Sequence, residues 1–338
     1  MSNVLVTGGT GYIGAHCCVA LIEAGYHPVV LDNLVNSSPA VLDRIERITG
    51  FRPPFLMGDV RDRAAVSSLL AEWRPLAVMH FAGLKSVAES VRLPLDYFDV
   101  NVHGTIELLR AMDEAGIRTI IFSSSATVYG APDSAPVAED AAKRVANPYG
   151  RSKLMAEEVL EDLATSDPRW SIARLRYFNP VGAHPSGLMG EDPRGTPNNL
   201  MPYIAQVAVG RRERLAIFGG DYPTRDGTGV RDYIHVMDIA EGHLAALEYL
   251  RQTPGLLSLN LGTGSGLTVR EVVAAFERAS GVTIPVEIVP RRPGDVAECY
   301  ADPALAARRL GWSSKRSLDD MCVDAWRWQS QNPDGYDL

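Results

Sequence analysis

Cysteine is scarce in this 338-residue sequence, which has only Cys17, Cys18, Cys299 and Cys322. Their spacing matches no metal-binding motif, so we expect no metal. Cys17 and Cys18 fall inside a helical pattern, where buried packing is their expected role. Few, unpatterned cysteines fit a reducing compartment, and we expect the protein in the cytoplasm.

Long apolar runs and clusters of positive charge are also missing. No uninterrupted apolar stretch approaches the ~18 residues of a membrane span, and no signal-like segment precedes Val4. The formal net charge is -8, and the basic doublets at 211–212, 291–292 and 308–309 are isolated. Such an acidic chain is a poor candidate for nucleic-acid binding. We therefore expect neither membrane nor nucleic acid as a partner, and only small anions at the arginines.

What the sequence does have is ample apolar material, 46% of all residues, arranged in short runs that alternate with helical patterns. The runs at 4–7, 28–31, 55–57, 77–81, 119–123 and 172–176 are predicted strands, and helices are predicted at 13–24, 63–73, 95–115 and 149–163. Strand–helix alternation with nearly continuous apolar strands favours a parallel sheet buried on both faces. The prediction is an α/β fold with a doubly wound parallel sheet of the Rossmann type.

The composition changes after Phe178. Residues 179–199 and 219–229 are dense in glycine and proline, which indicates long functional loops or a domain crossing. A further strand is expected at 256–261, returning to the main sheet, and further helices at 269–279 and 302–310. We predict a nucleotide-binding domain over residues 1–178 and a smaller α/β substrate domain over 179–338, with some interleaving.

A glycine-rich turn follows the first predicted strand. Gly8, Gly11 and Gly14 have the spacing that lets a backbone approach a pyrophosphate at a helix N-terminus, although such turns also occur for structural reasons. Asp32 follows the second strand, where a carboxylate accepts hydrogen bonds from the adenosine ribose; its alternative role is that of a turn residue. No arginine lies within 32–38 to hold a 2′-phosphate, so NAD is favoured over NADP.

Two later strand ends add candidates for the same ligand. Asp59 and Val60 could address the adenine, although Gly58-Asp59 also makes an ordinary turn. Lys85 ends the segment 81–85 at the carboxyl edge of the sheet, where ligands of this architecture bind. It could meet the pyrophosphate, or be an exposed loop lysine.

The candidate catalytic pair is Tyr149 and Lys153, which share one face of a predicted helix. A phenol titrates near pH ~10, too high for a base at neutrality, and a nearby ammonium should lower that pKa. The pair could therefore take a proton from an alcohol. A serine from 123–125, at the end of the fifth strand, could relay or stabilise that proton. The same spacing also occurs by chance on helix surfaces.

The order of these motifs resembles the extended short-chain dehydrogenase/reductases, and in detail the UDP-galactose (UDP-glucose) 4-epimerases among them. The resemblance extends over nearly the whole chain. The matching segments are 4–14 (VLVTGGTGYIG), 32–37, 80–85 (HFAGLK), 122–130 (FSSSATVYG), 148–153, 176–187 (RYFNPVGAHPSG), 198–212, 215–219, 226–238 and 291–295.

The resemblance implies a role for each matching residue. Tyr149 would be the base, Lys153 its electrostatic partner and Ser125 the hydrogen-bonding serine, with Ser124 as the alternative. The implied NAD-binding residues, besides these three, are Gly8, Gly11, Tyr12, Ile13, Gly14, Asp32, Asn33, Asn36, Ser37, Asp59, Val60, Phe81, Ala82, Gly83, Lys85, Asn101 and Phe178. The implied UDP-sugar site comprises Asn179, Asn198, Asn199, Leu200, Ala216, Ile217, Phe218, Arg231, Tyr233, Arg292, Asp295 and Cys299, together with Ser125 and Tyr149. Arginine suits a diphosphate because its forked donors match phosphate oxygens. Without the resemblance, Arg231 and Arg292 could equally be surface partners of Asp232 or Asp295.

The implied reaction is reversible inversion at C4 of UDP-galactose and UDP-glucose through a transient 4-keto sugar and NADH. NAD would stay tightly bound as a prosthetic group, and the protein would be an isomerase. The resemblance also implies a homodimer through the helices at 95–115 and 149–163. Cys299 stands where a tyrosine often stands in members restricted to unmodified hexoses, which implies added activity on UDP-N-acetylgalactosamine and UDP-N-acetylglucosamine; a neutral packing change is the alternative.

Three rival functions remain on the same residues. A 4,6-dehydratase needs an acidic pair after the fifth strand, and Ala126 and Thr127 stand there instead. A net dehydrogenase would need exchangeable NAD. A non-catalytic NAD-sensing protein would be expected to lack Tyr149 and Lys153.

Overall fold

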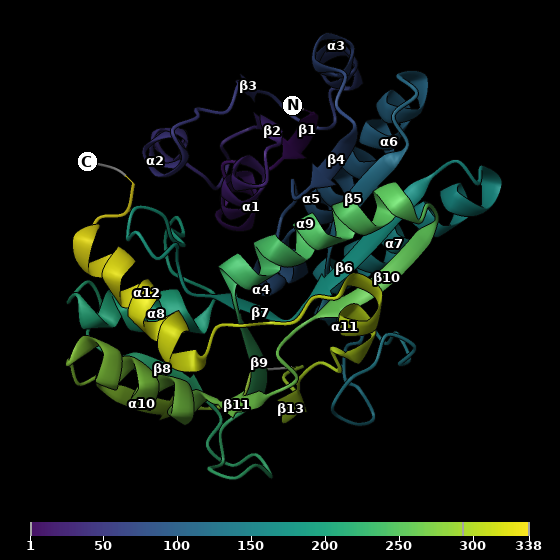
Figure 1. Cartoon of the computed structure of the whole chain (residues 1–338). Coiled ribbons are helices and arrows are strands. Elements are labelled where there is room, and N and C mark those ends of the chain that lie inside the picture. The colour runs from purple at the N-terminus through teal and green to yellow at the C-terminus, as the bar shows by residue number, and fades with distance from the viewer. Residues whose placement is uncertain (1, 293, 337–338) are drawn as a thin grey trace.

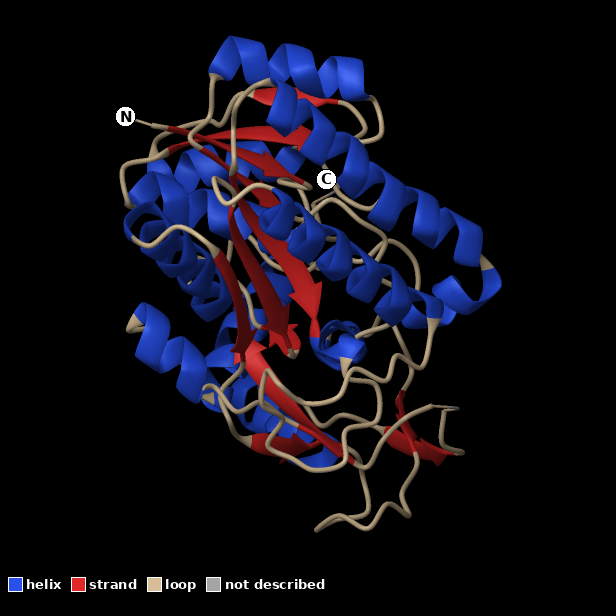
Figure 2. Cartoon of the chain, turned by 90° about the vertical axis from the view of Figure 1, so that its right-hand side faces the viewer, coloured by secondary structure: helices blue, strands red, loops and turns tan. Residues whose placement is uncertain are grey.

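The centre of the molecule is a parallel sheet of seven strands in the order β10-β6-β5-β4-β1-β2-β3. The computed structural model describes residues 2–292 and 294–336, and Figures 1 and 2 show the sheet running through the larger part of the molecule. The strands are β1 (Asn3–Thr7), β2 (His27–Asp32), β3 (Phe55–Met57), β4 (Ala77–His80), β5 (Thr119–Ser125), β6 (Ser171–Tyr177) and β10 (Leu256–Leu261). The predicted Rossmann-type sheet is confirmed.

Helices cover both faces of this sheet because alternate strand residues point to opposite sides. In β1, Val4 and Val6 join one apolar cluster with helices α1, α2 and α9, whereas Leu5 joins a second with α3, α6 and α7. The bounds are α1 (Tyr12–Glu23), α2 (Ala40–Thr49), α3 (Arg63–Trp73), α6 (Gly104–Glu114), α7 (Pro148–Ser166) and α9 (Val236–Gln252). The inner strands β1, β2, β4, β5 and β6 are thus buried on both faces, whereas the edge strand β3 is largely exposed.

The helix predicted over residues 95–115 is confirmed to within one residue at each end, and it contains a π-helical turn that the sequence did not predict. The segment forms α5 (Pro94–Phe98), a π-helical turn η1 (Asp99–His103) and then α6. Within the turn, Asn101 donates from Nδ2 to the carbonyl of Leu84 at 3.0 Å and accepts from its N–H at 2.8 Å. Such a turn often marks a functional position. A short helix that the sequence did not predict, α4 (Val87–Arg92), precedes it.

The second part of the molecule is built on β9 (Val230–His235). This strand pairs with β7 (Asn179–Val181), β11 (Gly266–Thr268) and β13 (Glu298–Cys299), while β8 (Leu215–Phe218) pairs with β12 (Val286–Val289). Helices α8 (Leu200–Ala208), α10 (Val269–Ser280) and α12 (Leu318–Gln331) share an apolar cluster with β8 and β9. Figure 1 shows this group below the main sheet.

The chain crosses between the two parts several times. After β9 it returns through α9 to the main sheet, where β10 pairs with β6 from Leu256 opposite Ile172 to Leu261 opposite Tyr177. It then leaves again to β11, and α11 (Ala304–Leu310) packs against the α9 face of the sheet. The two parts are therefore joined by several covalent connections rather than by one linker.

Among the described residues, no helix combines the length and apolarity that a membrane span requires. Within the same residues no group of three or more His, Cys, Asp or Glu side chains could hold a metal ion. Cys17 and Cys18 are buried in the sheet–helix core, which confirms their predicted packing role.

Candidate active site

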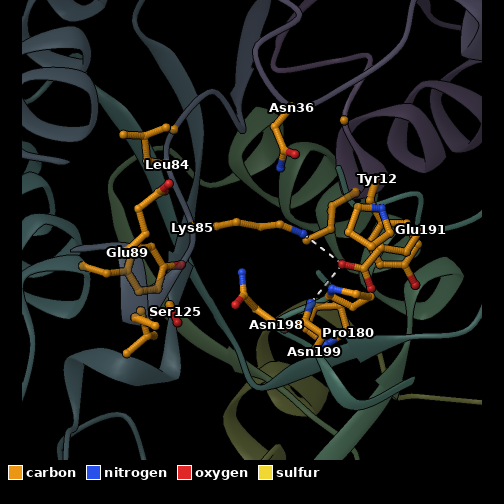
Figure 3. A pocket seen from close by; sticks show the side chains of 18 of the residues that line it. Tyr12, Asn36, Leu84, Lys85, Glu89, Ser125, Pro180, Glu191, Asn198 and Asn199 are labelled. Carbon is orange, nitrogen blue, oxygen red and sulfur yellow. Dashed lines mark hydrogen bonds and ion pairs between the residues drawn. The ribbon is translucent and has the colours of Figure 1, made fainter. Parts of the chain in front are cut away.

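A cavity of about 1660 Å³ lies between the carboxyl edge of the main sheet and the second part of the molecule. A pocket for one small ligand usually encloses about 300–1,000 Å³. The volume is therefore large enough for two ligands to lie side by side. Figure 3 shows side chains from both parts pointing into it.

The glycine turn forms one wall of this cavity. Gly8 has φ +70°, and a Cβ there would lie 2.6 Å from the N atom of Ala82; a Cβ on Gly14 would lie 2.3 Å from the carbonyl oxygen of Gly8. Both positions therefore require glycine. The tight turn brings the N-terminal end of α1 to the cavity, where unpaired backbone N–H groups favour an anion.

Asp32 ends β2 at the same wall and is held in a fixed orientation. Its carboxylate accepts from the N–H of Thr10 at 3.1 Å, the N–H of Leu34 at 2.9 Å and the hydroxyl of Ser37 at 3.1 Å. A carboxylate has about four acceptor sites, so one site, on Oδ2, remains to accept from a ribose hydroxyl. Beside it, Arg194 donates to the carbonyl of Ser37 at 2.6 Å. No arginine lies within residues 32–38 of the sequence. In the folded protein, however, Arg194 from a distant loop reaches this part of the cavity.

Tyr149 and Lys153 lie in the first turns of α7. Asn147 caps this helix by accepting from the N–H of Gly150 at 2.8 Å, and Pro148 occupies the first helical position. Lys153 donates from Nζ to the carbonyl of Ser123 at 2.8 Å. Because an ammonium has three N–H groups, the others stay available on the cavity side. The helix start and the end of β5 therefore position both side chains at the cavity.

Of the two candidate serines, Ser125 is the one that lies at the cavity. It lines the cavity and hydrogen-bonds the Tyr149 side chain. Ser124 points to the other side of β5, where its hydroxyl donates to Glu157 at 2.5 Å within a buried pair between Glu157 and Arg176. The alternation of side chains along a strand separates the two.

Burial controls the protonation of the pair. Burial raises the pKa of Tyr149, and only the hydrogen bond with Ser125 opposes it. Burial also lowers the pKa of Lys153 to about 8, with nearby Glu157 opposing that shift. In the chain by itself the pKa of Tyr149 is therefore raised, because removal from water outweighs the hydrogen bond with Ser125 that favours the phenolate. The expected effect of Lys153 on this pKa stays a prediction.

Lys85 follows β4 and reaches across the cavity. Its Nζ donates to Oε1 of Glu191 at 2.9 Å, and Asn199 donates from Nδ2 to the same oxygen at 2.9 Å. Figure 3 shows the three side chains converging. Lys85 is thus an exposed loop lysine, with its side chain 49% exposed, and also a residue of the cavity wall with a buried carboxylate partner.

The opposite wall carries the residues predicted for a UDP-sugar. The guanidinium of Arg292 lies 3.7 Å from the ring centroid of Phe218, and Arg231 lies 4.0 Å from a carboxylate oxygen of Asp295. Asp232 is not the partner of Arg231, because it is buried and accepts from Thr263, Gly264 and Ala301. That alternative is wrong. This wall therefore presents two guanidinium groups beside an apolar strand.

All the predicted site residues line this one cavity, with the exception of Asn101. Asn101 is buried; its amide N–H groups donate to Leu84 and to the hydroxyl of Ser152, the latter at 2.9 Å, and its Oδ1 accepts from Leu84. These bonds hold the loop after β4 against the catalytic helix. A direct contact between Asn101 and a cofactor stays a prediction.

Several cavity residues were not identified from the sequence: Thr127, Glu191, Arg194 and Tyr222. Thr127 donates from its hydroxyl to Ser125 Oγ at 3.0 Å. Glu191 and Arg194 lie in the glycine- and proline-rich segment 179–199, and Tyr222 in the segment 219–229. The loop composition was the one signal that marked these regions as functional.

Comparison with known proteins agrees with this geometry. Residues 5–325 match the protein family described as GDP-mannose 4,6 dehydratase. The UDP-glucose 4-epimerase of Bacillus subtilis (strain 168) is 58% identical, with 98% of each chain covered, and that of Mus musculus is 54% identical, with 99% of each covered.

Solved structures show the same relationship. The UDP-glucose-4-epimerase of Stenotrophomonas maltophila, with bound NAD and formylated UDP-arabinopyranose, has a TM-score of 0.97 at 54% identity, covering 98% of this chain and 99% of that one. The enzyme of Bifidobacterium longum, in complex with NAD+ and UDP, has a TM-score of 0.96 at 50% identity, covering 99% and 100%. The chain belongs to the UDP-glucose 4-epimerases of the extended short-chain dehydrogenase/reductase family.

Proposed function

We propose that this protein is an NAD-dependent isomerase that interconverts UDP-galactose and UDP-glucose by inverting C4. The observation that carries the proposal is the place of Tyr149, Ser125 and Lys153. They lie in a cavity that has a glycine turn and Asp32 on one wall and two arginines on the other. A sugar attached to UDP on the arginine wall would meet a nicotinamide held from the glycine wall at these three side chains.

The residues of the chain fit the binding of NAD. The glycines bring the N-terminus of α1 to the pyrophosphate, and Asp32 offers an acceptor to the ribose. When bound, NAD would accept a hydride from C4 of the sugar and return it to the opposite face.

Tyr149 is the group that moves the proton. As hydride leaves C4, its phenolate would take the proton of the 4-hydroxyl and return that proton when the 4-keto sugar is reduced. Because burial raises the pKa of Tyr149 in the chain by itself, Lys153 and the bound ligands must stabilise that phenolate. Ser125 hydrogen-bonds Tyr149 and favours its ionised form. Lys153 supplies a positive charge whose position is fixed by the carbonyl of Ser123. Tyr149 thus acts on the substrate proton, and Ser125 acts through Tyr149.

The second wall explains how one site can serve both faces of a sugar. Arg231 and Arg292 can hold the diphosphate by paired hydrogen bonds, and the apolar strand of residues 216–218 can lie along the uracil. Binding energy concentrated on UDP leaves the sugar free to turn between the two hydride transfers. The cofactor must stay bound throughout, so NAD acts as a prosthetic group.

A dehydratase reaction has less support, although the matching family carries that description. Elimination of water needs an acid and a base after β5. The residues there are Ala126 and Thr127, and the Thr127 hydroxyl is bonded to Ser125. Neither side chain has an ionisable carboxyl group, which favours epimerisation.

The deciding experiment is incubation of the purified protein with UDP-galactose, without added NAD, followed by separation of the UDP-sugars. Formation of UDP-glucose supports both the reaction and a retained cofactor. Accumulation of NADH on addition of free NAD would instead support a net dehydrogenase. No product even with NAD would withdraw the named substrates.

Cys299 favours a second activity, on UDP-N-acetylgalactosamine and UDP-N-acetylglucosamine. It lies in β13 opposite Arg231 of β9 and lines the cavity. A cysteine side chain leaves volume for an acetamido group that a larger side chain would fill.

The arrangement of the whole protein is part of the proposal. Residues 1–178 would form the NAD-binding domain, and 179–338 the UDP-sugar domain, with residues 256–261 contributed to the first. A homodimer would form through α5, α6 and α7, where Leu95 and Met155 expose apolar side chains. The unpaired cysteines fit a cytoplasmic enzyme.

A further inference from the structure

We propose that Glu191 is a positioning residue that couples the cofactor site to the substrate site, an inference that rests on the proposed function. Its Oε1 accepts hydrogen bonds from Lys85 Nζ and Asn199 Nδ2, each at 2.9 Å. One oxygen atom thus joins a residue of the cofactor wall to a residue of the substrate wall (Figure 3).

The two donors come from different parts of the chain. Lys85 lies on the loop after β4, close to Ala82, whose backbone packs against the glycine turn at Gly8. Asn199 is the N-cap residue of α8, yet its side chain makes no capping hydrogen bond. An asparagine at this position usually caps the helix. Here its amide is directed to Glu191 instead.

The backbone at Glu191 is held firmly by the C-terminal region. A Cβ on Gly190 would lie 2.3 Å from the Trp328 ring, so only glycine allows the observed packing. Tyr336 accepts from the N–H of Gly190 at 3.1 Å, and the indole N–H of Trp328 donates to the carbonyl of Glu191 at 3.4 Å. The backbone that carries the Glu191 carboxylate is therefore held in place, so the carboxylate can orient Lys85 and Asn199.

Folding stability does not account for this carboxylate. Glu191 is buried, and its Oε2 has no hydrogen-bond partner among the residues that the structure describes. A buried acceptor without a partner is costly. The same charge contributes, after burial, to the raised pKa of Tyr12 at the start of α1. Such a group is better explained by its effect on ligands than by its contribution to the core.

Coupling follows from the shared oxygen. The Lys85 ammonium has three N–H groups, so it can donate to Glu191 and still reach a diphosphate on the cofactor wall. A UDP group bound at the substrate wall, next to Asn199, would fix the position of Glu191 Oε1. The same oxygen accepts from Lys85. Because coupling between two ligands is reciprocal in binding free energy, UDP should raise the affinity for NAD by the factor by which NAD raises the affinity for UDP. We expect the higher affinity for NAD to show as its slower release.

The test measures release of NAD from the purified holoenzyme after dilution, with and without UDP, which is not turned over. In the unsubstituted protein we expect UDP to slow release by about fivefold or more. In Glu191→Gln, which preserves shape but removes the charge, that ratio should fall toward one. Glu161→Gln is the matched control: its carboxylate pairs with Arg174 at 2.8 Å and lies outside the cavity, so the ratio should not change.

Lys85→Met removes the hydrogen bond between Lys85 and Glu191 at its donor. It should also remove the UDP effect, and adding Glu191→Gln to it should cause no further loss, because both substitutions break one connection. An unchanged ratio in Glu191→Gln, or no UDP effect in the unsubstituted protein, would overturn the proposal. Calorimetry with UDP separates the two proposals: UDP binding without epimerisation would remove the proposed function alone, and absence of UDP binding would remove both.

Discussion

Ser124 and Ser125 are neighbours at the end of β5, yet their hydroxyl groups serve opposite sides of the strand. Ser124 donates to Glu157 in the core, and Ser125 meets Tyr149 at the cavity. One serine therefore supports the fold and the other supports the chemistry. The two roles can be separated by substitution.

Ser125→Ala should lower kcat by about tenfold to a hundredfold, because it removes a hydrogen bond that favours the Tyr149 phenolate. It should lower the free energy of unfolding by only about 0.5–2 kcal/mol, through the lost bonds from Thr127. Ser124→Ala should lower the free energy of unfolding by about 1–3 kcal/mol, because Glu157 loses a buried donor. Steady-state kinetics and denaturant unfolding of both variants check this. The reverse pattern would reassign the catalytic serine.

Tyr149→Phe should reduce epimerisation by about 10²–10⁴-fold, the usual contribution of a positioned base. The retained NAD should not change, because the phenol is not required for the glycine turn or for Asp32. Turnover and bound NAD should be measured on the same preparation. Tyr203→Phe is a suitable control, since Tyr203 also lines the cavity but lies in α8 on the substrate wall. Unchanged turnover in Tyr149→Phe would remove the tyrosine from the mechanism.

Three buried histidines predict acid sensitivity. Burial lowers the pKa of His16 and of His80 to about 3 and that of His243 to about 4. The unfolded chain takes up protons below about pH 6.5 while the folded chain does not, so stability is lost as pH falls. Between about pH 7.5 and 5.5 each histidine should remove about 1.4 kcal/mol from the free energy of unfolding.

Denaturant unfolding at both pH values measures that loss. His243→Gln should reduce the loss by about one third, since one of three similar contributions is removed. If His243→Gln shows the full loss, the assignment of this pH dependence to buried histidines is wrong.

Cys299→Tyr should selectively reduce activity on the N-acetylated UDP-sugars, by about tenfold or more relative to UDP-galactose, because a tyrosine ring would fill the volume beside the sugar. The relevant quantity is the ratio of kcat/KM for the two substrate classes. Cys299→Ser, which keeps the side chain small, should preserve that ratio. Equal ratios in the tyrosine variant and the unsubstituted protein would show that Cys299 does not determine this selectivity.

Leu95 is 79% exposed on α5, which suits an apolar contact in the proposed dimer. Leu95→Glu should shift the sedimentation coefficient toward that of a monomer, because it places a charge in an apolar interface. Val323→Glu on α12 is the matched control, as Val323 is also exposed but lies in another region. A monomer in the unsubstituted protein would contradict the interface.

The parts of the site that could be predicted are those that local sequence determines. The turn at Gly8 and the pair Tyr149 and Lys153 depend on short spacings next to one strand or within one helix. Glu191 and Arg194 could not be predicted, because irregular loops carry them to walls built by distant residues. The π-helical turn at Asn101 was missed for the same reason, since it depends on a contact with Leu84.

Helix α9 contains a residue whose role could not be predicted from the sequence. Gly242 lies in its middle, where a Cβ would come within 3.0 Å of Leu261 in β10. A glycine inside a helix weakens the local helical signal. The reason for it becomes visible only when the neighbouring strand is known.

The pairing of β10 with β6 has a consequence for how this protein can be divided. A fragment ending at residue 178 would lack β10 and would expose the backbone groups of Ser171–Tyr177 along a free sheet edge. Such an edge invites pairing with other chains and aggregation. We therefore expect that residues 1–178 do not fold into a stable domain by themselves. In a chimera of two relatives, residues 256–261 should come from the same parent as residues 1–178.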